Sequence, residues 1–320
     1  MNRMTMTAAA AAVILAAACV GARAEAPRSQ SSSGAAAPAS APPGPLTPLV
    51  EDILSAAGTR TGLCVVPNSG SGELAAEIVR RSRFFVQALE VDEAKLEVAR
   101  RTLDATGVYG RRTGAQRGSL SRLPYPDYCA NLIVCDLPAL PQGAACWTEL
   151  MRVLRPGGLA YVGQSAETAG SGEGFSAEAL KTQLAAAGIE NFDIVRNRGV
   201  WARIRRARPD GMGDWSHSRW GTAGNNPCVD DKLVKAPFHT QWIAGPNSFT
   251  KFGLALASNG RVLLRHGGIT HEGRYAPPPG PDLIQAFDAY NGALLWQWRL
   301  EEREGEGLVA VGDRIFAAAP

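Results

Sequence analysis

A short apolar run that ends in a glycine-rich turn constrains the fold of this chain most. Residues 63–66 read Leu-Cys-Val-Val, which is typical of a buried strand, and the turn Asn68 to Gly72 follows almost at once. A helical pattern then begins at Glu73, whose negative charge suits the amino-terminal end of the helix dipole. Glycines in such a turn let backbone N–H groups approach a ligand closely. Strand, turn and helix in this order predict the first unit of a doubly wound α/β domain.

Length and charge set the bounds for the rest of the chain. The 320 residues are 45% hydrophobic and carry a formal net charge of +3, which predicts roughly two domains with full cores. So small a net charge gives no case for nucleic-acid binding. The six cysteines form no CxxC pair and the four histidines show no ligand-like spacing, so we predict no metal site. A disulfide from Cys129 to either Cys146 or Cys135 is left open.

The first residues predict export. Residues 1–24 have a positive start, an apolar centre and a small-x-small cleavage site, as a signal peptide does. The apolar run is too short and too rich in alanine for a stable membrane span, although an uncleaved anchor is the alternative. Residues 25–46 are rich in Ala, Pro and Ser, and we interpret them as a linker. We therefore expect a periplasmic or extracellular protein.

An acidic residue follows the second predicted strand. Residues 84–89 form that strand and Glu90 ends it, while Asp92 is a plausible N-cap for the next helix. Glu90 lies about twenty residues after the glycines, where dinucleotide and nucleoside sites hold the ribose. A carboxylate suits this role because it accepts hydrogen bonds from both hydroxyls. The spacing favours a ribose-binding role for Glu90 over that of an ordinary charge at a strand end.

Strands and helices continue to alternate up to residue 208. Residues 118–120 read Gly-Ser-Leu, residues 123–127 read LPYPD, and a strand follows over 132–136. A helix over about 144–154 is expected to end in the sequence Arg-Pro-Gly-Gly, before a strand over 159–162. A last helix and two more strands close the domain.

Residues 47–208 resemble a class I S-adenosylmethionine-dependent methyltransferase of the small-molecule type. The resemblance rests on the glycine turn, Glu90, LPYPD and RVLRPGGLAYV. It implies a seven-stranded, doubly wound, Rossmann-like sheet with helices on both faces and S-adenosylmethionine as cofactor. The residues it assigns to the cofactor are Asn68, Ser69, Gly70 and Gly72 near the methionine end, Glu90 at the ribose, and Ser119 and Leu120 beside the adenine.

Four positions depart from the family pattern. Val66 stands where an acid is usual, and Asn68 stands where the first glycine is usual. Ser119 replaces an acid that faces the adenine amine, and Asn131 replaces an Asp in the fourth strand. Asn tolerates a left-handed backbone better than most residues, so the turn can survive. Together, however, the four changes predict a weakened or lost cofactor site.

Asp136 is the candidate catalytic residue. It ends the fourth strand, at the place from which some members of the family contact the methyl acceptor. Direct displacement needs mainly alignment, and a base helps when the acceptor must lose a proton. The alternative, a strand-end carboxylate that caps a loop, is the commoner role for such a residue.

Residues 211–320 show a different pattern of short strands and turns. Ala286, Asp288, Gly292 and Trp296 match the blade repeat of quinoprotein-type, PQQ-like β-propellers. That resemblance implies that the Asp braces a turn and that the Trp packs between blades. A propeller needs typically four to eight blades, and this region holds little more than one. We therefore expect an incomplete, loosely packed all-β region and a chain that is a piece of a longer protein.

The sequence leaves three functions open. The first is methyl transfer from S-adenosylmethionine to an unknown small-molecule acceptor. The second is an exported, non-catalytic scaffold, whose propeller binds a protein or cell-surface partner. The departures at Val66, Asn68 and Ser119 favour this second function, as does export away from the cytoplasm, where S-adenosylmethionine is made. A quinone-dependent dehydrogenase is the weakest of the three, because it needs the missing blades.

Overall fold

The computed structural model describes residues 42–141, 143–169, 175–210, 212–217, 240–243, 252–266, 283–299 and 308–317. The predicted signal peptide and the linker up to residue 41 lie outside these ranges, as do Cys19, Cys228, His239 and His271. Among the described residues, no helix has the length and hydrophobicity that crossing a membrane requires.

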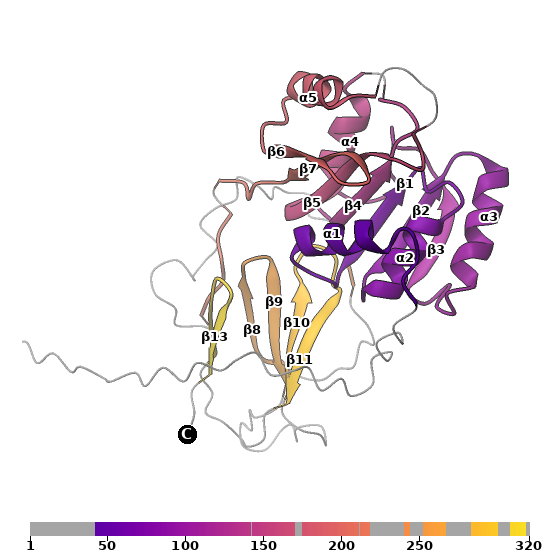
Figure 1. Cartoon of the computed structure of the whole chain (residues 1–320). Coiled ribbons are helices and arrows are strands. Elements are labelled where there is room, and N and C mark those ends of the chain that lie inside the picture. Colours follow the sequence, from indigo (N-terminus) through magenta and orange to yellow (C-terminus); the bar gives the residue numbers. More distant parts are fainter. Residues whose placement is uncertain are drawn as a thin grey trace, which may run out of the picture.

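A seven-stranded sheet forms the first part of the chain, as predicted (Figure 1). Its strand order is β3-β2-β1-β4-β5-β7-β6, and β7 runs antiparallel to both of its neighbours while the other pairs are parallel. The strands are β1 (Leu63–Pro67), β2 (Phe85–Glu90), β3 (Thr113–Arg117), β4 (Ala130–Asp136), β5 (Leu154–Ser165), β6 (Phe192–Arg196) and β7 (Gly199–Arg205).

Helices cover both faces of this sheet. They are α1 (Thr47–Ala57), α2 (Glu73–Arg81), α3 (Glu93–Asp104), α4 (Ala145–Val153) and α5 (Ala177–Ala186). Cys64 and Val66 of β1 pack with α1, α2 and α3, whereas Val65 belongs to the cluster that includes α4 and α5. Successive strand residues point to opposite faces, so a strand buried on both faces must be apolar throughout. The Leu-Cys-Val-Val run therefore marks the centre of the sheet.

Two local predictions can be compared with the structure directly. Asp92 caps α3 as expected, because its side chain accepts a hydrogen bond from Lys95 N at 3.0 Å. The helix expected over about 144–154 is confirmed, but the strand expected over 159–162 begins earlier than predicted, so that Arg155 to Gly158 belong to it. Helix α4 ends at Val153, and β5 begins at Leu154, which pairs with Ala130 of β4. Pairing with a neighbouring strand thus decides the conformation of this segment.

The later strands form two further sheets. The strands β8 (Phe252–Ser258), β9 (Arg261–His266), β10 (Leu283–Asp288) and β11 (Leu294–Arg299) build an antiparallel meander in chain order. The strands β12 (Leu308–Val311) and β13 (Arg314–Ala317) pair as a hairpin and share a small core with the meander. The predicted turn at Asn259-Gly260 joins β8 to β9, with positive φ at both residues. The propeller itself stays a prediction.

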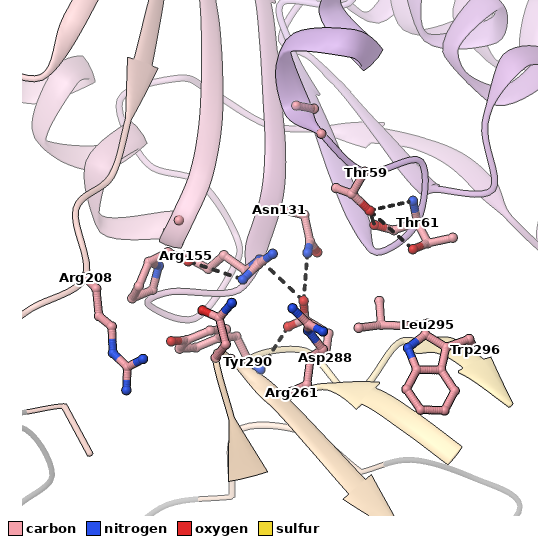
Figure 2. Close-up of a pocket in the computed structure, with 16 residues that line it drawn as sticks. Thr59, Thr61, Asn131, Arg155, Arg208, Arg261, Asp288, Tyr290, Leu295 and Trp296 are labelled. Atoms are coloured by element: carbon pink, nitrogen blue, oxygen red, sulfur yellow. Dashed lines mark hydrogen bonds and ion pairs between the residues drawn. The ribbon is translucent and has the colours of Figure 1, made fainter. Parts of the chain in front are cut away.

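The meander meets the first sheet where β4 and β5 begin. A cavity of about 490 Å³ lies at this junction, with residues of both parts in its lining. Figure 2 shows Asn131 and Arg155 of the first sheet pointing toward Asp288 and Tyr290 of the meander. Trp296, which the resemblance placed between propeller blades, lines this cavity and is partly buried against the core of the meander.

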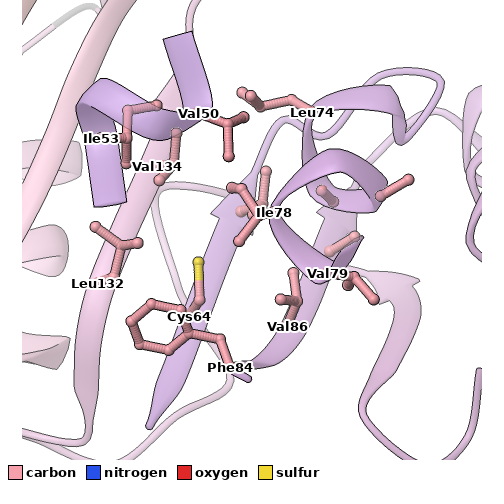
Figure 3. Packing of buried hydrophobic residues seen from close by; sticks show 14 of the residues in the cluster. Val50, Ile53, Cys64, Leu74, Ile78, Val79, Phe84, Val86, Leu132 and Val134 are labelled. Atoms are coloured by element: carbon pink, nitrogen blue, oxygen red, sulfur yellow. The ribbon is translucent and has the colours of Figure 1, made fainter. Parts of the chain in front are cut away.

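The helix face that carries α1 to α3 is closely packed (Figure 3). Cys64 lies among Ile78, Phe84 and Leu132, and all four side chains are fully buried. Burial raises the pKa of the Cys64 thiol well above its ordinary value. Cys129, Cys135 and Cys146 are also free thiols, so neither of the two disulfides left open by the sequence is formed.

Substituting Gly72 tests the contact between α2 and α3. A Cβ at Gly72 would lie 3.0 Å from Ala99 Cα, whereas a Cβ at Gly70 would meet nothing within 4 Å. Both glycines have positive φ, so each substitution by alanine carries the cost of a left-handed backbone. We expect Gly72→Ala to lower the free energy of unfolding by about 1–3 kcal/mol more than Gly70→Ala, because only it overpacks the contact. Urea denaturation of both variants measures this difference, and equal losses would contradict it.

Candidate functional site

The turn after β1 keeps its predicted shape. Asn68 has φ of 51°, Gly70 has 56° and Gly72 has 81°, so all three lie in the left-handed region. Asn adopts this region more readily than other residues with a side chain. Backbone hydrogen bonds fix the turn further, since Ser69 N donates to Leu89 O and Gly72 N donates to Ser69 O, each at 2.9 Å. The departure at Asn68 is therefore accommodated without loss of the turn.

Glu90 binds this turn directly. The carboxylate is 5% exposed, and its Oε2 accepts a hydrogen bond from Gly70 N at 2.8 Å. Its Oε1 accepts from Val91 N at 2.9 Å and from Asp92 N at 3.1 Å. A carboxylate has about four acceptor positions, so three of them are used by the backbone. One position on Oε2 remains for a ligand, at the carboxyl ends of β1 and β2.

Two further features of the turn fit a ligand with polar groups. Ser69 Oγ is buried and has no hydrogen-bond partner among the residues that the structure describes. Buried hydroxyls are normally paired, so an orphan one indicates a partner that binds separately. The Cβ position of Gly70 faces open space. The turn therefore offers a close approach to the backbone beside an unsatisfied hydroxyl.

The segment after β3 lies beside Glu90. Gly118 N donates to the backbone oxygen of Glu90 at 3.1 Å. The Ser119 hydroxyl is half-buried and lies 2.8 Å from the Ser121 hydroxyl, so it already has a partner. Leu120 is 6% exposed and packs into the core on the α4 and α5 face. Ser119 thus directly follows a residue that is hydrogen-bonded to Glu90. The contact of Ser119 and Leu120 with an adenine stays a prediction.

The sequence did not predict the clamp that holds LPYPD. Arg152 of α4 donates to Tyr125 O and Asp127 Oδ1, at 2.8 and 2.7 Å. It also pairs with Glu149, which in turn accepts from Leu123 N at 2.6 Å. The hydrogen bond from Arg152 is the main cause that lowers the pKa of Glu149. The spacing of Glu149 and Arg152, three residues apart on one helix, is the signal that could have revealed the clamp.

Asp136 has a clear structural role at the end of β4. Its carboxylate accepts hydrogen bonds from Ser165 N at 2.9 Å, Ser165 Oγ at 2.7 Å and Thr168 Oγ1 at 2.7 Å. These contacts hold the segment that follows β5. They agree with the interpretation of Asp136 as a loop-capping residue, and its catalytic role stays a prediction. Ser165 and Thr168 were not among the predicted site residues.

The structure gives a physical reason for two of the four positions that depart from the family pattern, Asn131 and Val66. Asn131 lies at the opposite end of β4 from Asp136, and its Oδ1 accepts a hydrogen bond from Leu63 N at 2.8 Å. The expectation that Asn131 weakens the cofactor site is therefore wrong, because Asn131 lies at the opposite end of the strands from the turn after β1. Val66 is 1% exposed and packs in the core of the α1 to α3 face. An apolar residue suits that environment.

Residues 68–158 match the protein family described as "Methyltransferase domain". The match begins at Asn68, includes Glu90 and Asp136, and ends at Gly158 in β5. The match covers less than a third of the chain, and it describes this part as similar to a methyltransferase domain. Together with the strand order of the sheet, the match supports a class I methyltransferase domain in this part of the chain, and it implies S-adenosylmethionine as the cofactor.

Solved structures with a similar fold carry related names. One is a Methanococcus maripaludis protein named as an S-adenosyl-L-methionine-dependent methyltransferase, with 23% identity, 52% of this chain and 88% of that chain covered, and a TM-score of 0.47. Another is a SAM-dependent methyltransferase from Aquifex aeolicus, with 22% identity, 48% and 89% covered, and a TM-score of 0.40. No curated protein matches the chain. The assignment of the methyltransferase domain therefore rests on the family match.

Titration of Glu149 tests the clamp on LPYPD. Arg152 lowers the pKa of Glu149 in the folded domain. The Glu149 carboxylate therefore stabilises the folded state fully above the ordinary carboxyl pKa of about 4.3. This stabilisation is lost as the pH falls through the lower pKa that Glu149 has in the folded domain. We expect Glu149→Gln to lower the free energy of unfolding by about 1–3 kcal/mol at pH 7. This deficit should shrink steadily below about pH 4.

Unfolding at several pH values, with Glu190→Gln as the exposed control, measures the deficit of Glu149→Gln. The control should differ little from the wild type throughout. A deficit of Glu149→Gln that is equal at pH 7 and pH 3 would show that its charge contributes nothing to the clamp.

Proposed function

We propose that the methyltransferase domain transfers the methyl group of S-adenosylmethionine to a small-molecule acceptor. The observation that carries this proposal is the meeting of Glu90 with the turn after β1. There the Gly70 amide, a free acceptor position on Glu90 and the orphan hydroxyl of Ser69 lie together at the carboxyl edge of the sheet. Ligands of open α/β sheets bind at this edge.

Each side of the turn has a proposed role. The turn from Asn68 to Gly72 lines the methionine end, where Ser69 Oγ gains its missing partner. Glu90 takes one ribose hydroxyl on the open position of Oε2. A second hydroxyl has to compete with a backbone N–H for the carboxylate, since three acceptor positions are filled. Ser119 and Leu120 remain our proposed neighbours of the adenine.

The acceptor is proposed to enter over the end of β4. When bound, S-adenosylmethionine supplies a methyl group on a sulfonium sulfur, which keeps the electron pair of the broken bond. The chain then has to align the acceptor, and alignment can contribute most of the rate acceleration. Asp136 has one acceptor position beyond its bonds to Ser165 and Thr168, which could receive a proton-bearing group. We propose Asp136 as the acceptor-side residue on this ground.

A non-catalytic scaffold is the second candidate. It is favoured by Ser119, whose hydroxyl is already paired with Ser121, and by the absence of an acid at Val66. In that case the fold would persist while cofactor affinity is lost. Binding of S-adenosylmethionine distinguishes the two functions, because only the enzyme needs it.

Export and the propeller are further proposals. Residues 1–24 support export, and cleavage of the full chain after Ala24 by a signal peptidase would test it. The antiparallel meander β8 to β11 supports a propeller blade, through which the protein would bind a protein or cell-surface partner. The quinone-dependent alternative gains no support from the residues that the structure describes.

A pair of carboxylate substitutions tests the proposed cofactor role. We expect Glu90→Gln to weaken S-adenosylmethionine binding at least about tenfold, because the new amide loses an acceptor and turns a donor toward backbone N–H groups. Asp92→Asn removes the same charge two residues away, and Asn caps helices as well as Asp does. This control should bind as the wild type does.

Isothermal titration calorimetry with S-adenosylmethionine on the full chain measures both variants. Equal affinity of the Glu90→Gln variant and the wild type would contradict the role of Glu90. A wild type that shows no binding would favour the scaffold.

A further inference from the structure

Two buried polar side chains meet between the first sheet and the meander. Asn131 Nδ2, at the start of β4, donates a hydrogen bond to Asp288 Oδ2, at the end of β10, over 2.7 Å. Asn131 is 3% exposed and Asp288 is 1% exposed. Figure 2 shows the two side chains pointing at each other across the junction. A carboxylate so deeply buried needs several partners, because burying an unpaired charge is costly.

The orientation of the Asn131 amide is fixed by the backbone. Leu63 N can only donate, and it lies 2.8 Å from Asn131 Oδ1, so this atom must be the oxygen. Gly62 leaves room for the amide, since a Cβ there would lie 2.2 Å from Oδ1. The Nδ2 group therefore has to point toward Asp288. The first sheet thus presents a rigid donor at its amino-terminal edge.

The meander presents a matching turn. Asp288 Oδ1 accepts from Tyr290 N at 2.9 Å, which braces the turn in the way the propeller resemblance implies. Asn291 Nδ2 then donates to two acceptors of the first sheet, Asn131 Oδ1 and Cys129 O, each at 2.7 Å. The turn and the start of β4 therefore exchange hydrogen bonds in both directions.

Arg155 adds a positive charge beside this pair. Its Nε lies 3.4 Å from Asp288 Oδ2, within ion-pair distance, although the geometry is not that of a hydrogen bond. The guanidinium also lies over the Tyr290 ring, with 5.6 Å between the guanidinium carbon and the ring centre. Arg155 thus offsets the buried charge of Asp288 from the side of the first sheet.

We propose that Asn131 is the docking residue by which the methyltransferase domain recognises the meander of its own chain. An aspartate at position 131, which the family resemblance implies as usual, could still accept from Leu63 N and Asn291 Nδ2. It would have no proton to donate to Asp288, and two carboxylate oxygens would face each other at hydrogen-bond distance inside the protein. The amide is therefore the residue type that lets a carboxylate-bearing turn dock here.

Exchanging the amide and the carboxylate tests this proposal. Asn131→Asp should make the backbone amides of residues 286–293 exchange with deuterium at least about tenfold faster at pH 7, because the facing carboxylates repel. Asp288→Asn should have a similar effect, since two amide donors would then face each other. The double variant places the carboxylate on β4 and the amide on the meander, and its exchange should return to within about threefold of the wild type.

Hydrogen–deuterium exchange of the full chain, read by mass spectrometry, measures all three variants. Asn191→Asp adds the same charge at an exposed position before β6 and should leave the exchange of residues 286–293 unchanged. An Asn131→Asp variant that behaves like this control would overturn the proposal. A double variant in which residues 286–293 exchange as fast as in the single variants would overturn it as well, whether or not that variant is folded.

Discussion

The carboxylate of Glu90 organises the carboxyl edge of the methyltransferase sheet. By accepting from Gly70, Val91 and Asp92, it joins the turn after β1 to the end of β2 and the start of α3. The backbone oxygen of the same residue holds Gly118. The chain's own hydrogen bonds therefore hold the turn in its left-handed shape. A preformed turn lowers the ordering cost of binding, which fits a site for S-adenosylmethionine.

The amino-terminal and carboxyl ends of the strands in this sheet have different roles. On β4, Asn131 lies at the amino-terminal end and Asp136 at the carboxyl end, about 16 Å apart at the usual rise of a strand. The first residue faces the meander and the second holds the segment after β5. The contacts between Asn131 and the meander thus do not use the end of the sheet that carries Glu90. The contact that joins the two parts is therefore separate from the proposed cofactor site.

What the sequence revealed depends on how local the signal is. The order of strands and helices, the turn at Gly70 and the position of Glu90 follow from short patterns and spacings, and the structure has them. The end of the helix before Arg-Pro-Gly-Gly was predicted, but the start of the next strand at Leu154 was missed, because pairing with β4 extends that strand back through the segment. The bond from Asn131 to Asp288 joins residues 157 positions apart, and no local pattern reports such a contact.

The central claim is that S-adenosylmethionine binds at the turn beside Glu90. Amide chemical shifts of the ¹⁵N-labelled chain, followed while S-adenosylmethionine is added, test it most directly. The account predicts saturable shifts at Ser69, Gly70 and Val91, with little change at Leu63 on the opposite edge of the sheet. Shifts confined to Leu63 and the junction with the meander, or no shifts at a millimolar excess of ligand, would contradict it.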